Sequence, residues 1–111
     1  MFGSIMRARI KDGKRDEYIA LLNELVPSAD DYGHGLHSVE LAWEEADPQR
    51  VVAIIHFRDK ESYIANANRA DTNEQFKRQA ALFDGEPEWI DVNYSEFVGQ
   101  SLKATVGAAS A

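Results

Sequence analysis

The side chains best suited to chemistry lie in one short segment, where an apolar run leads into a helical pattern. Tyr63 has a hydroxyl that could orient a phenolic substrate or pass a proton, and Asn66 has an amide that could fix a carbonyl group. His56, at the end of the apolar run, is the best candidate for a general base. Each has a structural alternative: an aromatic packed on a sheet, a polar residue on an exposed helix face, and a histidine hydrogen-bonded at a strand end.

Two arginines near the N-terminus form a second candidate group. Arg7 and Arg9 share one face of an expected strand, and they could hold an anionic or enolate oxygen. They could equally form ion pairs with acidic residues of neighbouring strands. Trp43 and Trp89 are interpreted as large apolar groups of the core or of a subunit contact.

Other kinds of site have little support. The three histidines, His34, His37 and His56, show no compelling metal-ligand spacing, and the chain has no cysteine. We find no glycine-rich phosphate loop and no nucleophile motif. A formal charge of −7 argues against a nucleic-acid partner. No membrane-spanning run and no secretion signal are present, so we expect a cytoplasmic protein without membrane association.

The elements that position these residues follow from the apolar pattern. Residues 51–57 are nearly all apolar and rich in β-branched types, which is typical of a central strand. Asp59 is placed to cap the helix that follows without an intervening loop. Further strands are expected at Phe2–Ile10, Leu36–Glu45 and Glu88–Val98. A helix should follow Asp12-Gly13, and another should open at a capping box formed by residues 71–74.

This order of elements predicts one α+β domain over residues 1–98, followed by a loose tail at residues 99–111. The pattern is β-α-β-β-α-β with the second helix in two segments, which is the ferredoxin-like arrangement. We expect a four-stranded antiparallel sheet in which the last strand borders the first, then the third, then the second, with all helices on one face.

The central strand is apolar on both of its faces, and helices can cover only one of them. The sequence therefore predicts a homodimer whose two sheets pack face to face. We expect the second strand to extend that contact through the row His37, Val39, Leu41 and Trp43. We also expect a mainly apolar cavity between sheet and helices, with Phe57 and Tyr63 in its wall.

Three segments carry a family resemblance: the run from Ile55 to Tyr63, the helix entry Asp12-Gly13-Lys14, and the strand entry Pro87-Glu88-Trp89. Over about residues 2–98 the chain resembles the antibiotic biosynthesis monooxygenase domain, one of the dimeric α+β barrels. The resemblance implies a homodimer with a pocket in each subunit. It also implies relatives that oxidise polyketide phenols and quinols without a cofactor, and others that degrade haem.

The match differs from position to position. Tyr63 stands where one oxygenase type has a tyrosine. Phe57 replaces a frequent tryptophan, Ala53 replaces an asparagine, and Asn66 replaces a frequent histidine. The resemblance also implies that the Met6 face of the first strand borders the pocket, whereas a ligand role for Arg7 needs the other face, and the sequence leaves both faces open.

We therefore carry two kinds of function forward. The first is a cofactor-independent monooxygenase of small aromatic molecules, which needs neither cofactor nor metal. Its predicted catalytic residues are Tyr63, Asn66 and His56, and its predicted substrate-binding residues are Phe57, Ala53, Arg7 and Trp43. The second is a non-catalytic dimer that binds a small hydrophobic or aromatic molecule, or an isomerase or cyclase that uses the same pocket.

Overall fold

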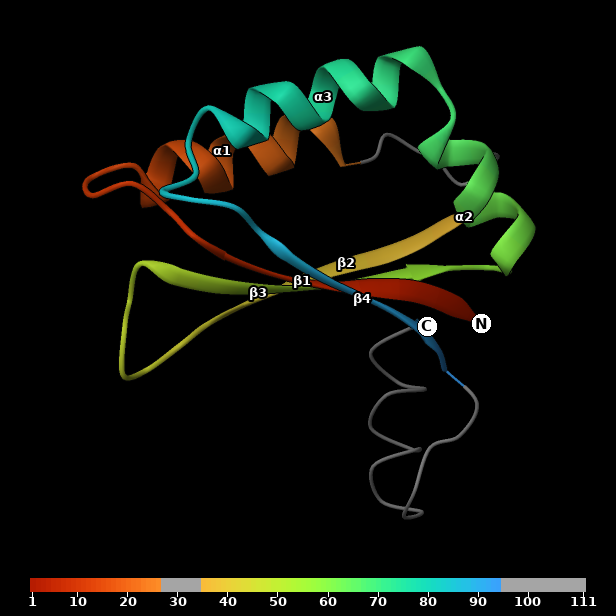
Figure 1. Ribbon diagram of the computed structural model, residues 1–111, viewed down its shortest axis with the longest axis horizontal. Helices are drawn as coiled ribbons and strands as arrows, with labels where there is room; N and C mark the ends of the chain where they lie inside the picture. Colours follow the sequence, from red (N-terminus) through yellow and green to blue (C-terminus); the bar gives the residue numbers. More distant parts are fainter. Residues whose placement is uncertain (27–34, 95–111) are drawn as a thin grey trace.

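The structure, a computed structural model, describes residues 1–26 and 35–94. The elements in chain order are β1 (Phe2–Arg9), α1 (Arg15–Leu25), β2 (Leu36–Trp43), β3 (Arg50–Phe57), α2 (Lys60–Ala67), α3 (Ala70–Ala80) and β4 (Glu88–Asn93). The strands form one antiparallel sheet in the order β2-β3-β1-β4, and the three helices lie on one side of it (Figure 1). The predicted ferredoxin-like fold is thus confirmed. The predicted tail, His34 and the end of the last strand lie outside the described residues.

The core lies between the sheet and the helices. Met6 of β1 is paired with Ala53 of β3, which is paired in turn with Leu41 of β2, so these side chains form one row on the helix-covered face. Met6 and Ala53 are buried, as is Tyr18, which α1 contributes from above. The strand β3 therefore pairs with both β1 and β2, and its residues Val51 and Ala53 are part of the hydrophobic core.

The joint between β3 and α2 forms as the sequence predicts. Asp59 is the N-cap of α2, and its Oδ1 accepts a hydrogen bond of 2.8 Å from the backbone N–H of Ser62. This bond is the first cause that lowers the pKa of the Asp59 carboxyl. The cap fixes where the first turn of α2 begins, and so where Tyr63 lies.

The expected capping box at residues 71–74 does not form. The helix α3 begins earlier, at Ala70, and its N-cap residue Arg69 makes no side-chain capping bond. Asp71 is therefore already inside the first turn, where its carboxylate accepts hydrogen bonds of 3.0 and 2.5 Å from the Arg69 guanidinium. It also accepts one of 3.0 Å from the N–H of Thr72. Asp71 is therefore a residue of the first turn of α3, and it is not the N-cap residue.

The predicted face of β2 is wrong. Leu41 and Trp43 pack against the core on the helix side, and the ring of Tyr18 meets that of Trp43 edge-on, 6.3 Å between centroids. His37 leaves the row because an irregularity in the pairing with β3 falls between Leu36 and Ser38. The row therefore belongs to the core of one subunit and cannot extend a contact through the other face.

None of the helices α1, α2 and α3, which are those of residues 1–26 and 35–94, covers the opposite face of the sheet. Register pairs Ile5 of β1 with Ile54 of β3 and with Ile90 of β4, and it pairs Val52 with Ala42 of β2. Ile90 is 60% exposed, while Ile5 and Ile54 are partly buried. We refer to this surface as the open sheet face.

No helix among the described residues is long and apolar enough to cross a membrane.

Tyr18 provides a test of the core. Its side chain is fully buried, its hydroxyl has no hydrogen-bond partner within residues 1–26 and 35–94, and burial raises its pKa to about 12 from an ordinary value near 10. The neutral form is favoured in the folded state, so its contribution is complete below pH 10 and is lost as the pH rises through about 12. We expect Tyr18→Phe to reduce this alkaline loss of folding free energy by about 2 kcal/mol at pH 12. Urea denaturation of both proteins at pH 7 and at about pH 12 measures it. Equal alkaline losses in the two proteins would refute the assignment.

Candidate functional site

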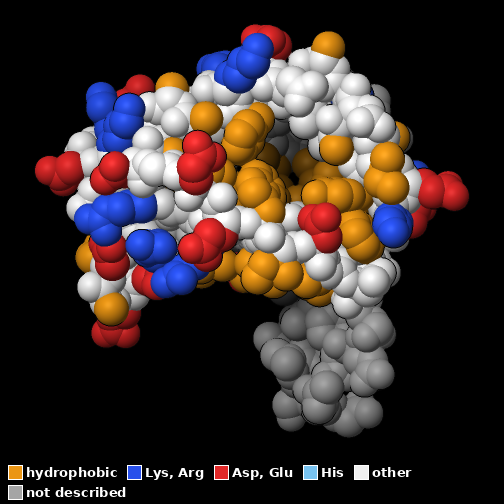
Figure 2. All heavy atoms as spheres, in the orientation of Figure 1, with side chains coloured by type: hydrophobic (Ala, Val, Ile, Leu, Met, Phe, Trp, Pro, Cys, Tyr) orange, Lys and Arg blue, Asp and Glu red, His pale blue; other side chains and the backbone are white. Residues whose placement is uncertain are grey.

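A cavity of about 310 Å³ lies between the sheet and the helices α2 and α3. Figure 2 shows a hollow bordered by hydrophobic side chains below the helical layer. The lining residues come from β2, β3, β4, α2 and α3: Leu36, Val39, Ile55, Phe57, Tyr63, Asn66, Ala67, Thr72, Asn73, Gln75, Phe76, Gln79 and Trp89. The expected cavity with Phe57 and Tyr63 in its wall is present.

Tyr63 is held at one end of this cavity by aromatic and polar contacts. Its ring centroid lies 5.1 Å from that of Phe2 and 5.4 Å from that of Phe57. Its hydroxyl donates a hydrogen bond of 2.8 Å to Oδ1 of Asp91 on β4, and the hydroxyl of Ser4 donates one of 3.2 Å to the same oxygen. The ring is thus fixed, with its hydroxyl joined to a carboxylate.

The electrostatics keep this tyrosine protonated. Burial is the first cause that raises the pKa of Tyr63, and the hydrogen bond to Asp91 raises it further. The Asp91 carboxylate can take the tyrosine proton across 2.8 Å, while the phenolic oxygen keeps lone pairs for another donor. The pair is therefore able to relay a proton away from a ligand in the cavity.

Asn66 lies on the same wall, one helical turn after Tyr63. Its Oδ1 accepts a hydrogen bond of 3.4 Å from the hydroxyl of Thr72, which connects α2 to α3. This contact leaves the NH₂ group as the part of the amide able to donate to a carbonyl or phenolate oxygen. The structure thus brings together Phe57, Tyr63 and Asn66 of the predicted site.

His56 lies elsewhere. It precedes Phe57 in β3, so its side chain is on the open sheet face, where its ring lies 4.0 Å from that of Tyr94 between centroids. Its Nδ1 is buried without a partner in the described part of the chain. Burial is the first cause that lowers its pKa, and the nearby His37 lowers it further. The sheet separates His56 from the cavity.

The remaining predicted residues also fall outside the cavity lining. The Arg7 side chain points to the open sheet face, where it makes hydrogen bonds of 2.9 and 2.8 Å to the Glu44 carboxylate. Arg9 pairs with Asp47. Ion pairing, the open alternative for both arginines, is what the structure shows. Ala53 and Trp43 are on the cavity side of the sheet but are packed into the core.

Sequence reasoning missed several residues that the cavity contains. Trp89 of β4 is paired with Met6 of β1, so its side chain is on the face of the sheet that the helices cover. The ring of Trp89 lies 5.7 Å from that of Phe76 between centroids. Gln75 and Gln79 reach the cavity from α3. The sequence feature that could have identified Gln75 and Gln79 is the helical spacing of residues 72, 75, 76 and 79, which places all four on one face of the helix.

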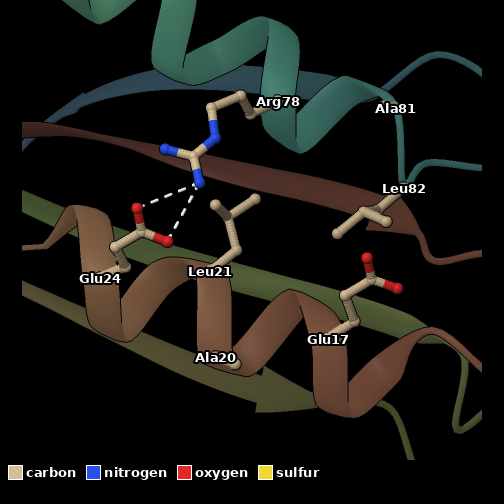
Figure 3. Close-up of a pocket in the computed structure, with 7 residues that line it drawn as sticks. All are labelled: Glu17, Ala20, Leu21, Glu24, Arg78, Ala81 and Leu82. Atoms are coloured by element: carbon tan, nitrogen blue, oxygen red, sulfur yellow. Dashed lines mark hydrogen bonds and ion pairs between the residues drawn. The ribbon is translucent and has the colours of Figure 1, made fainter.

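A second hollow, of about 470 Å³, lies between α1 and α3 (Figure 3). Its apolar lining consists of Ala20, Leu21, Ala81 and Leu82. Arg78 crosses the hollow and donates hydrogen bonds of 3.1 and 3.0 Å to the two carboxylate oxygens of Glu24. This ion pair occupies Arg78 and Glu24, and the remaining charged residue of the lining, Glu17, is paired with Lys14 at 3.2 Å. Although larger, the hollow offers less chemistry than the cavity beside Tyr63. Within the two described ranges, no group of three acidic or histidine residues is placed to hold a metal ion.

Comparison with solved structures supports the same fold. An antibiotic biosynthesis monooxygenase is 16% identical, with a TM-score of 0.67 over 86% of this chain and 100% of that one. A conserved protein from Methanosarcina mazei Go1 is 16% identical, with a TM-score of 0.70 over 85% and 92%. Rv0793 from Mycobacterium tuberculosis is 12% identical, with a TM-score of 0.68 over 88% and 98%.

No curated protein matches the sequence significantly. The family model described as antibiotic biosynthesis monooxygenase, however, matches residues 1–81, which is most of the chain and includes the β3–α2 joint with Tyr63. The chain therefore belongs to the antibiotic biosynthesis monooxygenase family.

Proposed function

We propose that this protein is a cofactor-independent monooxygenase of small aromatic substrates such as quinols or polyketide-like phenols. The observation that carries the proposal is the Tyr63–Asp91 hydrogen bond at the wall of an apolar cavity. A reaction in which the substrate's own anion reduces oxygen asks three things of the protein: orientation, deprotonation and exclusion of water. The residues of the cavity, together with Asp91, are suited to orientation and deprotonation.

Deprotonation of the substrate is assigned to the hydrogen-bonded pair Tyr63 and Asp91, which we call the relay. A substrate hydroxyl donates its proton to the oxygen of Tyr63 while Tyr63 passes its own proton to Asp91, so the tyrosine stays neutral. This fits the raised pKa of Tyr63. The resulting aromatic anion donates electrons to O₂. For an anthrone, the methylene carbon loses two hydrogens and gains one oxygen atom, and the second oxygen atom leaves with both hydrogens as water.

Orientation is assigned to the aromatic walls and to Asn66. The rings of Phe57, Phe76 and Trp89 offer flat apolar surfaces to a planar substrate. The Asn66 amide can donate a hydrogen bond to the oxygen that becomes negative. No role in the reaction is proposed for His56, because it lies across the sheet.

We also propose that two copies of the chain pair through the open sheet face to form a homodimer. The paired isoleucines Ile5, Ile54 and Ile90 make an apolar centre on the side of the sheet opposite to α1, α2 and α3. Apolar burial is worth roughly 25 cal/mol per Å², so covering this face stabilises the fold and the pair together. We expect a total interface of about 2,000 Å² or more.

Oxygen uptake tests the enzymatic proposal. A panel of quinols and anthrones is mixed with the purified protein without added flavin, haem or metal, and consumption is followed with an oxygen electrode. We expect uptake with at least one member, and roughly a 100-fold lower rate for Tyr63→Phe and for Asp91→Asn, because both remove the relay. Tyr18→Phe is the matched control, since that tyrosine lies in the core away from the relay; its rate should equal that of the wild type.

Two results would contradict this function. Uptake that persists unchanged in both relay variants would exclude the relay, and no uptake with any member would exclude the class of substrate. The relay also suits an isomerase or cyclase, which moves protons without oxygen. The same panel incubated anaerobically in deuterated water distinguishes that alternative, because it would place deuterium on carbon in the product with no oxygen consumed.

A further inference from the structure

The inward face of α3 differs from that of an ordinary covering helix. A helix over a sheet normally presents an apolar stripe at positions i, i+3, i+4 and i+7. In α3 those positions are Thr72, Gln75, Phe76 and Gln79, and no residue of this helix is fully buried. Only Phe76 is apolar. The helix thus presents amide and hydroxyl groups to the cavity where packing alone would favour leucine or valine.

The wall that faces these groups is apolar. Val39, Ile55 and Phe57 form the sheet side of the cavity, and Trp89 closes one flank with its ring against Phe76. The cavity therefore has two unlike sides, one of hydrocarbon and one of neutral hydrogen-bonding groups. A ligand that fits both sides has a flat apolar body with polar atoms gathered along one edge.

Charge is absent from this cavity wall. Within residues 35–94, where the lining lies, none of its members is acidic, basic or a histidine. A smaller adjoining hollow of about 100 Å³ shares Asn66, Thr72, Gln75 and Gln79 with the cavity and adds Arg69 and Asp71. Those two side chains bond each other at 3.0 and 2.5 Å, so the pair brings no free charge to a ligand.

We propose that the cavity selects an uncharged aromatic ligand with hydroxyl or carbonyl groups along one edge, and that Asn66, Gln75 and Gln79 are the residues that recognise this edge. A carboxylate or phosphate on the ligand is excluded, because such a group enters as an anion and would lose its hydration without gaining a cation. The proposed substrate, in contrast, enters neutral and gives up its proton only at Tyr63. A volume near 310 Å³ is at the lower end of ligand cavities, which suits roughly two or three fused rings. The inference rests on the proposed function for the choice of an aromatic ligand, and it adds which aromatics are accepted.

Binding without turnover tests this selection. Equilibrium dialysis under nitrogen uses three tricyclic probes: a dihydroxyanthraquinone with both hydroxyls beside the same carbonyl, unsubstituted anthraquinone, and anthraquinone carboxylate. We expect the dihydroxy compound to bind at least 10-fold more tightly than anthraquinone, and the carboxylate to bind more weakly than either. One hydrogen bond corresponds to about a 3- to 10-fold change in affinity.

The variant that carries the test is Gln75→Leu with Gln79→Leu. We expect it to lose the preference for the dihydroxy compound while it binds anthraquinone as tightly as before or more tightly, since leucine restores an apolar stripe. Retained binding of anthraquinone also shows that the variant is folded. Asn23→Leu is the matched control, an amide-to-leucine change on an exposed position of α1, and it should leave all three affinities unchanged.

Three outcomes would overturn the inference: a double variant that keeps the wild-type preference, a carboxylate that binds as tightly as the dihydroxy compound, or no binding of any probe.

Failure of this inference can be distinguished from failure of the proposed function. Anthraquinones are already oxidised and consume no oxygen, so the preference can hold in a protein that fails the uptake test, and uptake can occur in one that lacks the preference.

Discussion

Replacing Ile54 with aspartate is expected to convert a dimer into a folded monomer. Ile54 lies in the central strand on the open sheet face, paired with Ile5, and it is only partly buried in the single chain. In one chain the new carboxylate stays hydrated, so the fold survives. In a face-to-face dimer it would be buried without a cation, which costs roughly 3–5 kcal/mol, and two-fold symmetry places one such group in each subunit.

Sedimentation velocity over a concentration series measures the effect. The wild type should sediment as a dimer at micromolar concentration and the variant as a monomer with an unchanged far-ultraviolet circular dichroism spectrum. Ile64→Asp is the matched control, because Ile64 is 46% exposed on α2, on the other side of the sheet, and should remain dimeric. A wild-type protein that is a well-folded monomer at micromolar concentration would refute the proposed dimer.

Replacing Gly3 with alanine is expected to cost roughly 3 kcal/mol of folding free energy. Gly3 lies in β1 opposite His56 of β3. A Cβ at this position would overlap the backbone carbonyl oxygen of Ile55 and lie 2.9 Å from a ring carbon of Tyr94. The carbonyl belongs to the central strand and cannot rotate away as a side chain would, so the pairing of β1 with β3 must shift.

Gly13→Ala separates this steric cost from the cost of backbone conformation. Gly13 has a φ of +74° but open space where a Cβ would be. It should lose only about 1–2 kcal/mol, from the left-handed conformation alone. Urea denaturation of the wild type and both variants compares the two costs. A Gly3→Ala protein at least as stable as the Gly13→Ala protein would contradict the proposed close contact.

The sequence by itself determined the order of the elements and the site's central joint. A run that ends at Phe57 and is apolar except for His56, with Asp59 two residues later, defines a buried strand and a capped helix through local interactions alone. Tyr63 follows one turn later at a fixed angle, so its place beside Phe57 in the cavity wall was predictable. The one-sided helical layer followed from the β-α-β-β-α-β order.

Only the tertiary structure decided which groups meet. Side chains alternate between the two faces of a strand, so identifying a strand does not say which of its faces the helices cover. That choice placed Arg7 and His56 opposite the cavity, and the irregular pairing after Leu36 removed His37 from the row of Trp43. The hydrogen-bond partner of Tyr63 could not be predicted either, because it depends on how the strands pair. Asp91 lies 28 residues away in β4, and it reaches the tyrosine only because β4 pairs with β1.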